Sequence, residues 1–238
     1  MPSRRSEAGF TIVEMLVVTL IGGVLLMALM SMVDASQGAS NRSVQRVDSS
    51  QRGRVAMEQI TQALRSQVCI KDDPASLSPI AYGDARTLGF YAAVPRKVAG
   101  QVNPTAFAPE RRELRFETDG RIVEEVRPGT GTYPDMLFPT ITRRRAILTH
   151  AAPRRAGEAI FTYWALNPDG TVSGLPLAVP LSADDRESVV RVDIGFVAKP
   201  TSGNRTSGTQ TAFESSVSVR LPTRTDSDNP GSGPACML

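Results

Sequence analysis

The chain is poor in the groups that most enzymes use for catalysis. It has one histidine, His150, so a histidine-based metal site or a Ser-His-Asp arrangement would have a single imidazole to use. It has no glycine-rich phosphate loop. The acidic stretch 226–231 resembles the start of a calcium loop, but the glutamate required at the twelfth position is absent. We therefore expect no catalytic residues, no metal and no cofactor, and we expect that the protein is not an enzyme.

Aromatic residues are also scarce, at 5% of the chain, and the net charge is only +3. This small excess excludes a polycation built for nonspecific nucleic-acid binding. Arginines do form short clusters, at 111–112, at 154–155 and at Arg143, Arg144 and Arg145. Two interpretations of these clusters are open: a solvated face or loop, or contacts with DNA phosphates or an acidic surface. Few aromatic residues accompany the arginines, so base stacking is not indicated.

The sequence does contain a long apolar run that one acid interrupts. The run begins at Phe10 and continues to Val33, and Glu14 lies near its start. About 20 apolar residues are enough for a helix to cross a bilayer. A carboxylate in hydrocarbon costs about 3 kcal/mol on insertion scales, so chains keep one there mainly when it has a partner. Glu14 is therefore the first functional candidate.

A short polar leader, residues 1–9, precedes the apolar run. It contains Arg4 and Arg5, which place the N-terminus on the cytoplasmic side by the positive-inside rule. The chain after the run is then exported. These features predict a single-pass membrane protein whose head domain is extracytoplasmic.

The leader, Gly9, the pair Phe10-Thr11 and the acid at position 14 together resemble the N-terminal signal of type IV prepilins. In that family a prepilin peptidase cuts after the glycine, here between Gly9 and Phe10, and the new N-terminus is methylated. The resemblance is close over residues 1–35 and implies that the assembly helix 10–33 stays on the mature protein. It implies as partners the peptidase, other pilin or pseudopilin subunits, an inner-membrane assembly platform and membrane lipid, with the pilus or cell surface as the final location.

Charge explains why an acid belongs at this place in the run. Cleavage would leave an α-ammonium on Phe10, in or beside the bilayer, where it needs a partner as much as the carboxylate of Glu14 does. The two residues are i and i+4 on a helix and could pair within one chain. The resemblance implies instead a pair with the terminus of a neighbouring subunit, which sets the register of bundling helices. Either pairing makes Glu14 an assembly residue.

Two simpler interpretations of the N-terminus stay open. If the N-terminus were a secretory signal peptide, the apolar run would be removed with it, and residues 33–35 before Ser36 resemble a signal-peptidase cleavage site. Glu14, however, interrupts the apolar segment that such a signal peptide requires. A plain signal anchor would explain the apolar length but not the acid.

Beyond residue 33 the pattern stays helical and becomes amphipathic over 34–70. Apolar residues recur there at spacings typical of one buried stripe, namely Val47, Met57, Ile60, Leu64 and Val68. Gly38 and the polar residues of 34–43 predict a kink or a frayed turn. Pro74 indicates that the helix has ended before it.

Residues 71–222 have the pattern of an antiparallel β-rich head domain, and 223–238 that of a flexible polar tail. The strongest hairpin signal is Asp119-Gly120, which suits a two-residue type I′ turn. Such a turn would place Arg115 opposite Glu124, and Phe116 opposite Val123.

Further alternating runs predict strands at 87–92, 146–149, 159–166, 189–197 and 214–221. A second turn is expected at 167–170. We expect Tyr163 and Trp164 in the hydrophobic core.

The two cysteines, Cys69 and Cys236, both fall outside the membrane, where oxidation is allowed. A bridge between them would close a very long loop and contribute about 4 kcal/mol in the chain-entropy model. Two unpaired thiols are the alternative, because a bond requires α carbons within about 7 Å.

The expected fold class is α+β: a long N-terminal helix, membrane-embedded in its first half, packed on an antiparallel β-sheet head. This order, with the run 219–221 before a polar tail, is similar to minor pilins of the W type and J-type pseudopilins of type II secretion. The long head favours a minor subunit, because major pilins are usually shorter. The alternatives are a pilus component that binds DNA, as in DNA uptake, or another ligand, and a membrane-anchored or secreted domain of unrelated role, including an enzyme around His150.

Overall fold

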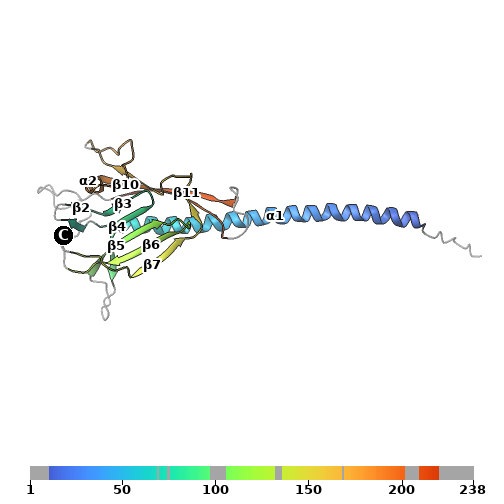
Figure 1. Cartoon of the computed structure of the whole chain (residues 1–238), viewed down its shortest axis with the longest axis horizontal. Helices are drawn as coiled ribbons and strands as arrows, with labels where there is room; N and C mark the ends of the chain where they lie inside the picture. The colour runs from blue at the N-terminus through green and yellow to red at the C-terminus, as the bar shows by residue number, and fades with distance from the viewer. Residues whose placement is uncertain are drawn as a thin grey trace, which may run out of the picture. The chain divides into compact units, whose positions relative to one another are not determined.

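The computed structural model describes residues 11–68, 70–73, 76–96, 106–131, 136–167, 169–201 and 209–219. The chain divides into two compact units, Met1–Val44 and Gln45–Leu238. The long helix α1 (Ile12–Arg65) contributes to both units, and every strand belongs to the second (Figure 1). The fold is therefore α+β, a long N-terminal helix followed by an antiparallel head, as the sequence predicts.

Helix α1 is continuous through residues 34–43, so the frayed turn predicted there as an alternative to a kink is wrong. Helix formation is cooperative, so a few weak helix formers within 54 residues remain helical because the residues on both sides of them are helical. The helix ends at Arg65 and not near residue 70. After Arg65 the backbone pairs with strand residues instead. Gln67 forms an isolated antiparallel β-bridge with Ala92, and the N–H of Val68 donates to the carbonyl of Tyr91 at 2.9 Å.

The buried stripe of α1 consists mostly of small residues. Its members are Ser49, Gly53, Ala56, Ile60, Ala63 and Leu64. Ile60 and Leu64 confirm the predicted stripe, whereas Val47 is half exposed. A Cβ added to Gly53 would lie 2.0 Å from the Phe213 ring, so the helix backbone lies directly on that ring. Hydrophobic periodicity missed the small residues of this stripe, Ser49 and Gly53 among them, because close approach to the head selects small side chains there.

Five antiparallel strands form the larger sheet, in the order β3-β4-β5-β6-β7. Their bounds are β3 (Ile80–Gly83), β4 (Thr87–Arg96), β5 (Ala106–Phe116), β6 (Ile122–Pro128) and β7 (Arg143–Leu148). Each strand pairs with the one that follows it in the chain, which makes the sheet a meander. Strand β7 is therefore an edge strand among the described residues.

The β5–β6 hairpin has a different register from the predicted one. Phe116 lies opposite Ile122 and Arg115 opposite Val123, one position away from the expected pairs. The turn contains three residues and not two: the N–H of Glu117 donates to the carbonyl of Arg121 at 2.8 Å, and Gly120 takes a φ of 81°. A three-residue turn that ends in a left-handed glycine adds one residue to the loop and shifts the pairing.

The second sheet has β10 (Val189–Ala198) at its centre. It pairs along its length with β11 (Thr211–Ser218), and with β9 (Phe161–Ala165) and the short β8 (Ala151–Ala152). The turn predicted at 167–170 is present, closed by a hydrogen bond from Asn167 N–H to the Thr171 carbonyl at 2.7 Å. The remaining elements are the hairpin of β1 (Ile70–Asp73) with β2 (Ser76–Ser78), and the short helix α2 (Ala183–Ser188).

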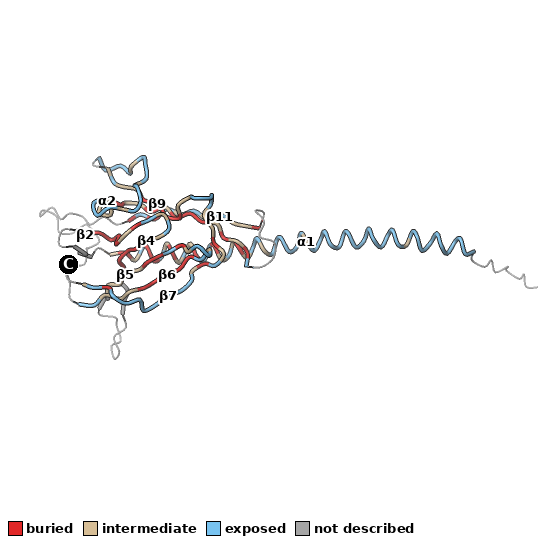
Figure 2. Tube along the Cα trace, viewed as in Figure 1, coloured by how far each residue is buried: buried red, intermediate tan, exposed pale blue. Residues whose placement is uncertain are grey.

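One hydrophobic core joins α1 to both sheets. Buried residues of α1, β4, β5, β9 and β10 belong to the same cluster, and Figure 2 shows them in red along these elements. Tyr163 is fully buried there, as predicted. Trp164 is not in the core: it is partly exposed, its indole N–H donates to Asp193 at 2.7 Å, and the Arg191 guanidinium lies 4.4 Å from its ring centre. Successive strand residues face opposite sides, so one ring of the pair had to point outward.

The contact between Gly53 and Phe213 generates a prediction for stability. Gly53→Ala is expected to lower the free energy of unfolding by about 1–3 kcal/mol, because the methyl group overpacks the helix against the ring. Gly38→Ala is the matched control in the same helix, since a Cβ there meets nothing within 4 Å. It should be neutral or stabilising by up to about 1 kcal/mol. Urea unfolding of the full chain in detergent measures both, and equal stability of the two variants would contradict the close approach.

Candidate functional site

The candidate site is the first turn of α1, where the acid of the apolar run lies. The helix begins at Ile12, and the N–H of Glu14 donates to the hydroxyl of Thr11 at 3.2 Å. Thr11 is therefore an N-cap that satisfies one of the free N–H groups of the first turn. Glu14 follows three residues later, where the helix dipole favours a negative charge. The Thr-x-x-Glu spacing of a capping box could have identified this start from the sequence.

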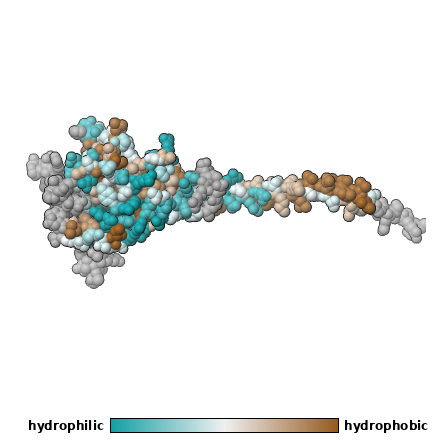
Figure 3. All heavy atoms as spheres, viewed as in Figure 1, coloured by the Kyte–Doolittle hydropathy of each residue, from teal (hydrophilic) through white to brown (hydrophobic). Residues whose placement is uncertain are grey.

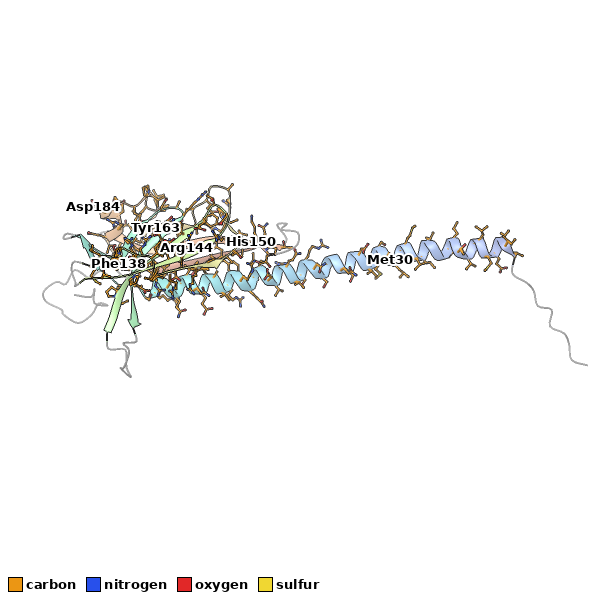
Figure 4. All side chains as sticks on the ribbon, turned by 60° about the horizontal axis from the view of Figure 1, so that its bottom comes forward. Met30, Phe138, Arg144, His150, Tyr163 and Asp184 are labelled. Atoms are coloured by element: carbon orange, nitrogen blue, oxygen red, sulfur yellow. The ribbon has the colours of Figure 1, made fainter. Side chains whose placement is uncertain are left out.

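The helix surface that follows is apolar on all sides. The residues from Ile12 to Val33 include sixteen exposed large hydrophobic side chains, which no part of the described structure covers. Figure 3 shows this segment in brown, and Figure 4 shows Met30 on it. The segment is long and apolar enough to span a membrane, and with the motif reported below it is compatible with a single-pass anchor.

The polar groups of this segment are satisfied within the helix. The Thr19 hydroxyl donates to the Leu16 carbonyl at 2.9 Å, and the Ser31 hydroxyl donates to the Ala28 carbonyl at 2.8 Å. Side chains that bond back to the helix backbone can be placed in hydrocarbon without another partner. Glu14 is the only charged residue between positions 11 and 33, so it is the one group whose placement in lipid needs a counter-charge.

The arginines of the 143–145 cluster lie on the edge strand β7 and contact acids of the same sheet. Arg145 pairs with Glu124 at 2.7 Å and Arg143 with the same carboxylate at 3.8 Å. Arg144, labelled in Figure 4, pairs with Glu125 at 3.4 Å and also with Glu117. These pairs account for the cluster as an internal feature of the head. Contact of these arginines with DNA stays a prediction.

Glu124 is the acid that organises this cluster. It is fully buried, and Arg112 reaches it from β5 at 3.2 Å while Arg145 reaches it from β7. A buried carboxylate is stable only when cations and hydrogen bonds replace water around it. Sequence reasoning missed this role because the wrong hairpin register paired Glu124 with Arg115.

A second set of charges lies on the opposite face of the same sheet, around Glu113. Burial alone would raise the pKa of Glu113, but hydrogen bonds from Tyr82 and Arg115 outweigh it and lower that pKa. Burial and the bond to Glu113 raise the pKa of the Tyr82 phenol. Arg127 also lies 3.4 Å from the Glu113 carboxylate. Both faces of the sheet thus hold acids that pair with partly exposed arginines.

His150 lies where the chain crosses from β7 to β8, that is, from one sheet to the other (Figure 4). Its backbone has a φ of 58°, in the left-handed region, and its carbonyl accepts from the Lys199 N–H at 2.9 Å. Within the described part of the chain, no group of three or more His, Cys, Asp and Glu side chains could hold a metal. Gly9, Phe10, Cys69 and Cys236 lie outside the described residues.

A family model described as the prokaryotic N-terminal methylation motif matches residues 4–30. The matched segment contains Gly9, Phe10, Thr11 and Glu14, the residues on which the resemblance to prepilins rests. The chain is therefore type IV prepilin-like at its N-terminus, and the motif implies processing by a prepilin peptidase and assembly with other pilin subunits. No curated protein matches the chain.

The ion pairs of Glu124 generate a prediction that separates structure from ligand binding. Arg145→Ala is expected to destabilise the head by about 3 kcal/mol, because it removes a partner of a fully buried carboxylate. Arg155→Ala, at an exposed arginine of the same head, should change stability by less than about 0.5 kcal/mol. Thermal unfolding of the full chain in detergent compares them.

The same two variants also test the DNA interpretation in a gel-retardation assay at moderate salt. If the pairs are purely structural, the unaltered chain retards no DNA. Retardation that disappears in Arg145→Ala under conditions where this variant is still folded would contradict a purely structural role.

Proposed function

We propose that this prepilin-like chain is a structural subunit of a type IV pilus or a type II secretion pseudopilus, and that it is one of the minor subunits. One observation carries the proposal. The first part of α1, residues 12–33, is apolar on every side and contains a single charged residue, Glu14, which lies in the first turn of the helix within a methylation motif. Such a helix is suited to lipid and to contact with other helices of its own kind.

The proposed mechanism begins with cleavage between Gly9 and Phe10 on the cytoplasmic face. The new α-ammonium on Phe10 and the carboxylate of Glu14 are then opposite charges in a low-dielectric medium, where their attraction is strong and each unpaired group is costly. Pairing of Glu14 with the terminus of a neighbouring subunit satisfies both groups. It also fixes the axial register of the helices, because any other register leaves a charge unpaired.

The head domain faces outward in this proposal and makes subunit-specific contacts. Its part in the function is structural: the described residues of the head supply ion pairs and a core, and we propose no reaction for them. The described part of the head contains a five-stranded sheet, a four-stranded sheet and the β1–β2 hairpin. This size supports the assignment to the minor class, whose members carry larger heads than the main filament subunit.

The first prediction of the proposal concerns processing. Mass spectrometry of the chain purified from cells that contain a prepilin peptidase should show an N-methylated Phe10 and no leader. Without the peptidase, the mass should correspond to the full leader with an unmodified N-terminus. A native chain that begins at Ser36 would show that the apolar segment is a removable signal, and the assembly proposal would be wrong.

The second prediction concerns Glu14 itself. Glu14→Gln should insert into the membrane as well as the unaltered chain or better, because a neutral side chain is easier to place in lipid. Its incorporation into filaments should fall by more than about tenfold, because an unpaired buried ammonium costs about 3–5 kcal/mol. Glu58→Ala, at an exposed acid of the same helix, is the matched control and should incorporate normally. Immunoblots of sheared filaments and of membranes measure both steps, and normal incorporation of Glu14→Gln would contradict the assigned role.

A further inference from the structure

The segment that follows β9 runs back along the edge of that strand and is bonded to it. The N–H of Ser173 donates to the Ala165 carbonyl and the N–H of Leu177 to the Tyr163 carbonyl, both at 2.8 Å. Farther along, the N–H of Leu181 donates to the carbonyl of Gly83 in β3 at 2.9 Å. These bonds hold the segment 171–181 in one conformation against both sheets.

The outward side of this segment is apolar. Leu177 and Leu181 point inward and pack on the core, whereas four aliphatic residues stay exposed around them. These four are Leu166, Val172, Leu175 and Val179, and together we call them the outer strip. Leu175 is 79% exposed, and Leu166 and Val172 are neighbours through an antiparallel bridge. Figure 3 shows brown atoms at the top of the head, where Figure 1 draws this segment.

Acidic residues outnumber basic ones in the stretch of chain that contains the outer strip. The chain from 164 to 190 contains Asp169, Asp184, Asp185 and Glu187 against a single base, Arg186. The Arg186 guanidinium donates to the Ala81 carbonyl and is partly buried. The region therefore presents three more acids than bases beside its exposed aliphatic side chains. An exposed apolar patch in a chain segment with an excess of one charge favours a partner that is apolar and of opposite charge.

A surface of that kind lies on α1 of the same chain. Val44, Val47 and Val55 are at least half exposed, and their spacing places them on one side of the helix, opposite the stripe that Ser49 and Gly53 bury. We call these three valines with Arg54 the stem face. The chain from 42 to 55 contains four arginines and one acid, Asp48, which pairs with Arg52 at 3.3 Å. The excess charge of this region is three positive, against three negative at the outer strip.

We infer that the outer strip of one copy of this chain docks on the stem face of α1 of a second copy. Both surfaces carry aliphatic side chains without cover in the described structure, and their charges are opposite and equal.

The contact is heterologous, because the two surfaces are different parts of the same molecule. Each copy can offer its strip to one neighbour and its stem to another, so the contact can join two or more copies in one direction. The inference deepens the proposed function and rests on it. For a minor subunit it also means that at least two copies are neighbours.

Photo-crosslinking of the full chain tests the contact. The variant Leu175→p-benzoylphenylalanine is irradiated in membranes of assembling cells, and the crosslinked peptides are identified by mass spectrometry. We expect dimers in which position 175 joins the 42–55 region of a second copy. Asp184→Lys or Arg54→Glu should each reduce the yield at least about fivefold, and the two together should restore it, because the charges are then exchanged.

Two further probe positions make the outcome unambiguous. A probe at Leu25, in the apolar helix, reports assembly in general, and a probe at Leu137, a 69% exposed residue elsewhere on the head, is the matched control that should not reach 42–55. Crosslinks from Leu25 without crosslinks from position 175 overturn the inference and leave the proposed function intact. Absence of both overturns both. Crosslinks from position 175 to another protein, or to a different region of a second copy, overturn the inference alone.

Discussion

The organisation of this protein depends on one constraint. The first part of α1 has an apolar surface and one carboxylate, and the described part of the chain covers neither. Its side chains are apolar on every side, its few hydroxyl groups bond back to the helix, and its single charge is Glu14. Water is a poor solvent for such a surface, and lipid is a poor solvent for the carboxylate. A bilayer followed by a bundle of similar helices satisfies both demands, provided that a positive group meets the acid. In the proposed function, cleavage before Phe10 supplies that group.

The head is attached to this helix by small residues. Ser49 is fully buried, and its hydroxyl reaches the Thr209 carbonyl at 2.9 Å, while Gly53 lets the backbone rest on Phe213. Larger side chains at these places would hold the helix away from the sheets. Both contacts lie in the second compact unit, which begins at Gln45.

Many charged residues of the head form ion pairs with one another within the larger sheet. Glu124 and Glu113 lie on opposite faces of one sheet, and each is surrounded by arginines that remain partly exposed. The same arrangement holds the edge strand β7 to β6 through charged side chains. Charged residues on an edge strand also discourage pairing with strands of other molecules. Contacts between subunits are then left to surfaces such as the outer strip and the stem face.

Local sequence patterns were enough to predict the N-terminal signal, the long helix, the role of Glu14 as a candidate and most strands of the head. Hydrophobic periodicity, turn residues and a short motif are all local properties of the chain. Ile60 and Leu64 in the buried stripe and Tyr163 in the core followed from the same patterns. Tertiary structure alone decided which small residues of α1 face the sheets, which way Trp164 points and which acid Arg145 meets. Those outcomes depend on distances between segments far apart in the chain and on a hairpin register that one extra turn residue shifts. No local pattern contains that information, because which residues become buried depends on two segments that meet only in the folded protein.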